Sequence, residues 1–188
     1  MSLLQFKFNN CLNDKNINKH KELVKVINQD LNFKKSLNFI PFLNEVHIDT
    51  EINKIKKLSA EFRKKFNNFC ILGTGGSSSG GQALIGLIPE LQERKFNFYY
   101  DIDPVFYEES LNNLNLAETG FVVISKSGST PETLGQLGAL IQKFEDTNLI
   151  PLIPENFVII TEDNRNPLNL IAKKFNIPIL IHNKEIGG

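Results

Sequence analysis

The chain has 188 residues, about one domain on the usual scale of roughly 100–200 residues per domain. Hydrophobic residues make up 41% and charged residues 22%, which excludes a wholly disordered or fibrous chain. Lys+Arg and Asp+Glu both number 21, whereas a protein that binds nucleic acid by counterion release needs a surplus of basic residues. We therefore expect no nucleic-acid partner.

The two cysteines, Cys11 and Cys70, indicate neither a disulfide framework nor a zinc site. Cys70 lies in the apolar run 69–72, where we expect a buried and unreactive thiol. The N-terminus lacks the apolar core of a signal peptide, and no apolar stretch approaches the ~20 residues that span a bilayer. We expect a cytoplasmic protein with no membrane partner.

The first fifty residues differ in composition from the rest of the chain. They are rich in Asn and Lys, contain no glycine, and show one helical pattern of apolar residues over residues 19–31. Pro41 disfavours helical geometry at Ile40, which predicts an extended connector over residues 38–42. We predict a helical N-terminal arm over residues 1–48, which either packs on the domain or a partner subunit or is a solvated leader.

From residue 49 onward, helical and strand patterns alternate. Apolar residues at helical spacing predict an amphipathic helix over residues 51–66, with Asp49 or Thr50 as its N-cap. Short apolar runs typical of buried strands follow, at residues 69–72, 96–100, 121–124, 157–160 and 177–181. The stretches between these runs predict helices over residues 82–93, 104–113, 131–147 and 167–175.

Near-continuous apolar strands separated by helices are typical of a parallel sheet that is covered on both faces. Residues 49–188 are therefore predicted to form an α/β domain, a doubly wound five-stranded parallel sheet with helices on both faces. In such sheets, ligands bind beyond the carboxyl ends of the strands, where the strand order reverses. The loops that follow the strands are thus the candidate sites.

The first predicted strand is followed by a loop rich in glycine, GTGGSSSGG at residues 73–81. A tight turn of this kind between strand and helix can point its N–H groups at an anion. A Walker A loop is excluded because no lysine follows the glycines. A dinucleotide fingerprint remains open: Gly73 and Gly75 fit its first two positions and Asp101 follows the second strand, although Ser78 replaces the third glycine.

The third predicted strand is followed by SKSGSTPET at residues 125–133, with five hydroxyl-bearing residues and one lysine in nine positions. This segment also begins a helix, either with Thr130 as N-cap before Pro131 or with Ser129 and Glu132 as a capping box. Both registers surround a helix N-terminus with short hydroxyls and place Lys126 beside it, which indicates a phosphate pocket without arginine. Because dinucleotide folds do not need this second cluster, it favours a phosphorylated small molecule.

These two loops resemble, in this order and spacing, the loops of the sugar isomerase (SIS) domain, and most closely those of the glucose-6-phosphate isomerase family. Ile186-Gly187-Gly188 resembles the start of that family's (V/I)GGR segment. The resemblance covers roughly residues 51–188 and implies the flavodoxin-like SIS fold. Departures from the family pattern occur at Thr74, Ser78, Ser79, Gly128 and Ser129. Gly128 stands where the family has a bulkier residue, and we expect it to loosen the loop.

The resemblance implies an aldose–ketose isomerase of glycolysis and gluconeogenesis that converts glucose 6-phosphate to fructose 6-phosphate. It implies no metal, nucleotide or other cofactor, a sugar phosphate as the small-molecule partner, and a homodimer. Carried over by position, it implies a phosphate-binding set of Ser125, Lys126, Ser127 and Thr130. Gly76 and Ser77 resemble residues that line the sugar, and Gly188 resembles the second glycine of the (V/I)GGR segment.

The same resemblance implies a general base Glu, a ring-opening His, a Lys and the Arg of (V/I)GGR, all further along than Gly188. Candidates within the chain are weaker, because Glu132 fits a helix cap and His182 fits a structural histidine. We therefore expect no catalytic or metal-binding residue in this chain, which alone would be inactive. It would be the N-terminal phosphosugar-binding part of an isomerase with two SIS domains.

Two other interpretations stay open at this point. A free-standing protein with a single SIS domain would act as a phosphosugar isomerase or as a sugar-phosphate sensor. A dinucleotide-binding domain would use the glycine-rich loop at residues 73–81 for a pyrophosphate.

Overall fold

The computed structural model describes residues 14–36, 49–88 and 93–186. The chain divides between Ile48 and Asp49 into two units, which are treated separately below. In the first unit, helix α1 (Asp14–Ser36) contains the predicted helix of residues 19–31 and extends beyond both of its ends. The predicted connector at residues 38–42 lies outside the described residues, as does Cys11.

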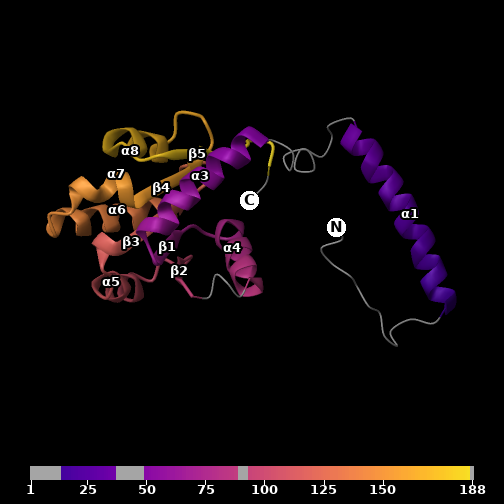
Figure 1. Ribbon diagram of the computed structural model, residues 1–188, viewed down its shortest axis with the longest axis horizontal. Coiled ribbons are helices and arrows are strands. Elements are labelled where there is room, and N and C mark those ends of the chain that lie inside the picture. The colour runs from indigo at the N-terminus through magenta and orange to yellow at the C-terminus, as the bar shows by residue number, and fades with distance from the viewer. Residues whose placement is uncertain (1–13, 37–48, 89–92, 187–188) are drawn as a thin grey trace. The chain divides into compact units, whose positions relative to one another are not determined.

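The second unit is an α/β domain (Figure 1). Its strands are β1 (Asn68–Leu72), β2 (Lys95–Tyr99), β3 (Thr119–Ile124), β4 (Phe157–Thr161) and β5 (Ile179–Ile181). Its main helices are α3 (Asp49–Lys65), α4 (Gly76–Leu87), α5 (Pro104–Asn112), α6 (Pro131–Asp146) and α8 (Pro167–Phe175). All strand pairs are parallel, in the order β2-β1-β3-β4-β5. The predicted five-stranded parallel sheet is confirmed, and its order is that of flavodoxin-like folds.

The two faces of the sheet pack against different helices, because side chains alternate along each strand. On one face, Cys70 and Leu72 of β1 belong to a buried cluster with residues of α5, α6 and α8. On the other face, Phe69 and Ile71 pack with Phe62 of α3 and with neighbouring strand residues. Figure 1 shows α5, α6 and α8 on the side of the strands away from α4, so the sheet is covered on both faces.

Helix α4 begins six residues earlier than the predicted start at Gln82, inside the glycine-rich segment. Gly75 has a φ of 57°, which turns the chain sharply after β1 and allows the helix to begin at Gly76. The backbone N–H of Ser78 donates to the carbonyl oxygen of Gly75 at 3.1 Å. The predicted loop at residues 73–81 is thus a short turn and the first helical turn, because local hydrogen bonds offset the low helix propensity of glycine.

The sequence patterns did not predict a further short helix, α7 (Ile153–Asn156). They also did not predict the 3₁₀ turns at Leu116–Glu118 and Ile150–Leu152. Asn156 is fully buried, and its amide Nδ2 donates to the carbonyl oxygens of Leu116 and Thr119 at 3.1 and 3.2 Å. This side chain joins the segment before β3 to the segment before β4. Such a bridge between distant segments leaves no periodic pattern in the sequence.

Three buried titratable groups, Cys70, Tyr99 and Tyr107, lie where the sheet packs against α5, and burial raises the pKa of each. The prediction that Cys70 is buried is confirmed, and burial raises the pKa of its thiol to about 12. Tyr107 is 7% exposed, and its hydroxyl donates to the backbone carbonyl of Gln136 at 2.8 Å. Burial raises the pKa of Tyr107 well above its usual range. In the part of the chain that the structure describes, no helix is long and apolar enough to cross a membrane.

Candidate functional site

The loops after β1 and β3 meet at the carboxyl edge of the sheet. These two strands are neighbours in the sheet. After β1 the chain crosses to β2 on one side, and after β3 it crosses to β4 on the other side. The strand order therefore reverses between β1 and β3, and their loops flank this switch point. Leu72 pairs with Val123, which brings Gly73 beside Ile124. A Cβ on Gly73 would lie 3.0 Å from the carbonyl oxygen of Ile124 and 3.1 Å from the Cβ of Ser77. Glycine at this position therefore permits the close approach of the two loops.

A cavity of about 360 Å³ lies at this edge, and we call it the switch-point cavity. Its lining residues come from the ends of β1, β3 and β4: Thr74, Ser77, Ile124, Ser125, Lys126, Ser127, Thr130, Glu162 and Asn164. The structure thus brings together five sequence-predicted site residues from two separate loops. Gly76 is the first residue of α4, next to Ser77, but does not line the cavity. Gly188 lies outside the described residues.

The hydroxyls of the loop at residues 125–130 bond to one another. Ser125 is 3% exposed, and its Oγ lies 2.7 Å from Oγ1 of Thr130. Ser127 Oγ accepts hydrogen bonds from the backbone N–H of Ser129 at 3.2 Å and from the Ser129 hydroxyl at 3.1 Å. The loop therefore presents a set of hydroxyls whose positions are fixed before any ligand arrives.

Helix α6 begins at Pro131, with Thr130 at the N-cap position. This start is one of the two that the sequence predicts. No side chain caps the helix, so the capping box of Ser129 and Glu132 is wrong, and so is a capping role for the Thr130 hydroxyl. The Thr130 hydroxyl bonds Ser125 instead. Consequently the first N–H groups of α6 have no side-chain acceptor, and the helix dipole favours an anion in that place.

The loop between β4 and α8 holds the loop at residues 125–130 in place. The carbonyl oxygen of Lys126 accepts hydrogen bonds from the Glu162 N–H at 3.0 Å and from Oγ1 of Thr161 at 3.3 Å. The carbonyl oxygen of Gly128 accepts a hydrogen bond from the Leu168 N–H at 3.1 Å. Gly128 is buried and hydrogen-bonded on both sides, so the expectation that it loosens the loop is wrong.

One cation and one carboxylate line the switch-point cavity. Lys126 Nζ lies 3.9 Å from Oε1 of Glu162, and their side chains are 32% and 20% exposed. The second carboxylate oxygen, Oε2, accepts a hydrogen bond from Asn164 Nδ2 at 2.9 Å. Sequence reasoning missed Glu162 and Asn164 because their loop has neither a glycine run nor a hydroxyl cluster. Their position just after the strand beside β3 is the signal that could have identified them.

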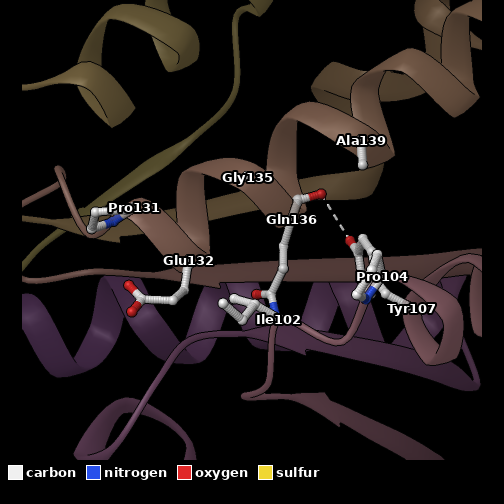
Figure 2. A pocket seen from close by; sticks show the side chains of 8 residues that line it. All are labelled: Ile102, Pro104, Tyr107, Pro131, Glu132, Gly135, Gln136 and Ala139. Carbon is white, nitrogen blue, oxygen red and sulfur yellow. Dashed lines mark hydrogen bonds between the residues drawn. The ribbon is translucent and has the colours of Figure 1, made fainter.

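The two weaker catalytic candidates lie elsewhere. Glu132 lines a different cavity of about 350 Å³, together with Tyr107 and Gln136 (Figure 2). Figure 2 shows the side chains of Glu132 and Gln136 on the same side of α6. His182 follows β5, where its Nδ1 lies 2.8 Å from the carbonyl oxygen of Asn183. Within the described residues, no group of three or more His, Cys, Asp or Glu side chains could hold a metal ion.

Comparison with known proteins places both loops in a characterised family. The family model of phosphoglucose isomerase matches residues 44–173. The glucose-6-phosphate isomerase of Borreliella afzelii (strain PKo) is 35% identical over 131 residues, which are 66% of this chain and 24% of that protein. The chain thus spans about a quarter of the length of this relative.

Two solved structures share the fold. A glucose-6-phosphate isomerase from Chlamydia trachomatis superimposes with a TM-score of 0.62 at 26% identity, over 74% of this chain and 26% of that chain. A hypothetical protein from Thermus thermophilus superimposes with a TM-score of 0.72 at 20% identity, over 92% of this chain and 41% of that chain. The family match covers more than half of the chain and includes both loops of the switch-point cavity. The chain belongs to the phosphoglucose isomerase family.

Proposed function

We propose that this chain supplies the phosphate-binding part of a glucose-6-phosphate isomerase, the enzyme that interconverts glucose 6-phosphate and fructose 6-phosphate. The observation that carries the proposal is the switch-point cavity, in which Ser125, Lys126, Ser127 and Thr130 surround the uncapped N-terminus of α6. Family membership supports this proposal over a dinucleotide site, which would not need the hydroxyl cluster after β3.

The hydrogen bonds within the cavity leave donors available for a phosphoryl group. In the Ser125–Thr130 pair, one hydroxyl donates to the other, so the accepting hydroxyl keeps its own O–H. Ser127 Oγ accepts from Ser129, so the Ser127 O–H is likewise available. With the ammonium of Lys126 and the N–H groups of α6, these donors match the oxygens of a dianionic phosphate ester.

Ser77, on the first turn of α4, lines the same cavity as the loop at residues 125–130. We propose that Ser77 and the backbone at Gly76 line the sugar, and that Gly188 does so as well, on the strength of the family resemblance. The homodimer, the cytoplasmic location and the lack of a metal or nucleotide cofactor are proposed on the same ground.

In this proposal, binding and chemistry are separate tasks. Isomerisation requires a carboxylate that moves a proton between C1 and C2, and a donor that polarises the carbonyl oxygen. The phosphate contacts hold the far end of the substrate and fix where its carbonyl carbons lie. The residues of the switch-point cavity would thus bind and orient the sugar phosphate, while the resemblance implies a base and an Arg outside this chain.

The proposal is tested by calorimetric titration of the 188-residue chain with fructose 6-phosphate. We expect Lys126→Ala to weaken binding at least tenfold, since a charge-assisted hydrogen bond contributes about 1.5–3 kcal/mol. Lys173→Ala removes an exposed lysine from the last turn of α8, and should leave binding unchanged. Unchanged affinity in a folded Lys126→Ala variant, or stronger stabilisation by NAD than by sugar phosphates, would overturn the proposal.

A further inference from the structure

Glu162 places a negative charge in the cavity to which we assign a phosphate. Its Oε1 lies 3.9 Å from Lys126 Nζ, and its side chain is 20% exposed. A site that bound only a phosphate would bind it more tightly without this carboxylate, because the negative charges of the carboxylate and the phosphate repel each other at close range. The position of Glu162 therefore indicates a second feature of the ligand, besides its negative charge.

The Glu162 carboxylate is held in this position by its own loop. Asn164 Nδ2 donates to Oε2 at 2.9 Å, and the Glu162 N–H donates to the carbonyl oxygen of Lys126 at 3.0 Å. The carbonyl oxygen of Glu162 accepts hydrogen bonds from Asn169 Nδ2 at 2.9 Å and Asn166 Nδ2 at 3.2 Å. These bonds fix both the backbone and one carboxylate oxygen, so the side chain is oriented before a ligand binds.

The other carboxylate oxygen of Glu162 keeps its capacity to accept hydrogen bonds. At 3.9 Å, the contact of Oε1 with Lys126 is an ion pair and too long for a hydrogen bond. Among the described residues, no donor lies within hydrogen-bond distance of Oε1. An ionised carboxylate is an acceptor only, with about two lone-pair sites on each oxygen. The ligand group that fits Oε1 is therefore a donor such as a hydroxyl.

We propose that Glu162 is a specificity-determining residue whose Oε1 accepts hydrogen bonds from the hydroxyl groups of the sugar. This inference rests on the proposed phosphate site. A phosphoryl oxygen bound to Lys126 Nζ at about 2.8 Å would lie within about 7 Å of Oε1, so carbons next to the ester bond can present hydroxyls to it. The switch-point cavity would then select polyhydroxylated phosphate esters over inorganic phosphate and over alkyl phosphates.

The test compares three ligands on the 188-residue chain by calorimetry: fructose 6-phosphate, butyl phosphate and inorganic phosphate. The wild-type chain should bind fructose 6-phosphate most tightly. Glu162→Gln keeps the shape of the side chain but removes its charge. It should lower the preference for fructose 6-phosphate over both other ligands by about tenfold, because hydrogen bonds to a charged acceptor are the stronger ones. Asp163→Asn changes the same charge on an exposed neighbour and should leave that preference unchanged.

Each other outcome contradicts the inference in a distinct way. If Glu162→Gln weakened the binding of all three ligands equally, Glu162 would only position Lys126. If the same substitution strengthened the binding of all three ligands equally, Glu162 would only repel anions. A wild-type chain that binds butyl phosphate as tightly as fructose 6-phosphate would overturn the inference without any variant. A wild-type chain that binds none of the three would overturn the proposed phosphate site, and the inference with it.

Discussion

The side-chain amide of Asn166 occupies the space where a Cβ on Gly128 would lie. Gly128 has a φ of 65°, in the left-handed region that favours glycine. Asn166 is also the N-cap of α8, and its Oδ1 accepts a hydrogen bond from the Asn169 N–H at 2.9 Å. The loop that would hold the phosphate is thus packed directly on the start of the next helix.

This contact predicts a large cost for a methyl group at residue 128. Gly128→Ala should lower the free energy of unfolding by about 1–3 kcal/mol, because alanine is strained at positive φ and its Cβ would displace Asn166. It should also weaken fructose 6-phosphate binding, since the loop at residues 125–130 must shift. Urea unfolding and calorimetry measure the two effects.

Gly138→Ala is the matched control for this substitution. Gly138 is an exposed residue within α6, and a Cβ there would meet no heavy atom within 4 Å. Alanine at this position should raise the free energy of unfolding by about 0.5–1 kcal/mol, because glycine is a poor helix former. A Gly128→Ala chain as stable as Gly138→Ala would show that the contact with Asn166 is unimportant.

Burial of Tyr107 predicts a loss of stability at alkaline pH. The pKa of Tyr107 is raised by burial, so above about pH 10 the unfolded chain releases a proton that the folded chain retains. The stability due to the neutral phenol is complete below that pH and falls as the pH rises. Cys70, with its pKa raised by burial to about 12, acts in the same direction from about pH 8.5 upward.

The measurement is urea unfolding at several pH values between about 8 and 11, the range in which unfolded thiols and phenols titrate. Tyr107→Phe should reduce the fall in unfolding free energy at the alkaline end, since phenylalanine has no proton to lose. Tyr100→Phe serves as the control, because Tyr100 is 60% exposed. Identical pH profiles for the wild type and Tyr107→Phe would refute this prediction.

We expect the 188-residue chain to isomerise fructose 6-phosphate at no more than a background rate. Glu162, the carboxylate that lines the switch-point cavity, lies beside Lys126, to which we assign the phosphate, and thus at the other end of the sugar phosphate from C1 and C2. A general base contributes about 10²–10⁴-fold to such a reaction, and electrostatic stabilisation about 10²–10³-fold. A coupled assay with glucose-6-phosphate dehydrogenase measures the rate.

Robust turnover in that assay would contradict the separation of binding from chemistry. Glu162→Gln would then be the first variant to assay, because Glu162 lines the cavity whereas Glu132 and His182 do not. A large loss of kcat with an unchanged KM in that variant would identify Glu162 as the base, because loss of a binding contact alone would raise KM.

The strands and most helices of the domain could be predicted from local patterns. The apolar runs that form β1 and β3 are hydrophobic on both faces, as central strands of a covered parallel sheet must be. Helix α8 matches its predicted range of residues 167–175, because Asn166 and Pro167 mark its start unambiguously. The start of α4 could not be predicted, since glycine and serine disfavour helices and only the turn at Gly75 makes one begin there.

By itself, the sequence determined that a hydroxyl-rich loop with Lys126 precedes a helix, and that this loop follows a buried strand. Such a loop is a contiguous segment, so its chemistry is visible without the fold. Only the tertiary structure decided which side chains complete the cavity. Strand order places β4 beside β3, so Glu162, just after β4, lies beside Lys126, just after β3. The neighbouring pair Thr161 and Lys126, which share a hydrogen bond, are 35 residues apart in the sequence. The folded shape of the loop at residues 125–130 also turned the Thr130 hydroxyl towards Ser125, because a hydrogen bond within that loop took the place of local capping of α6.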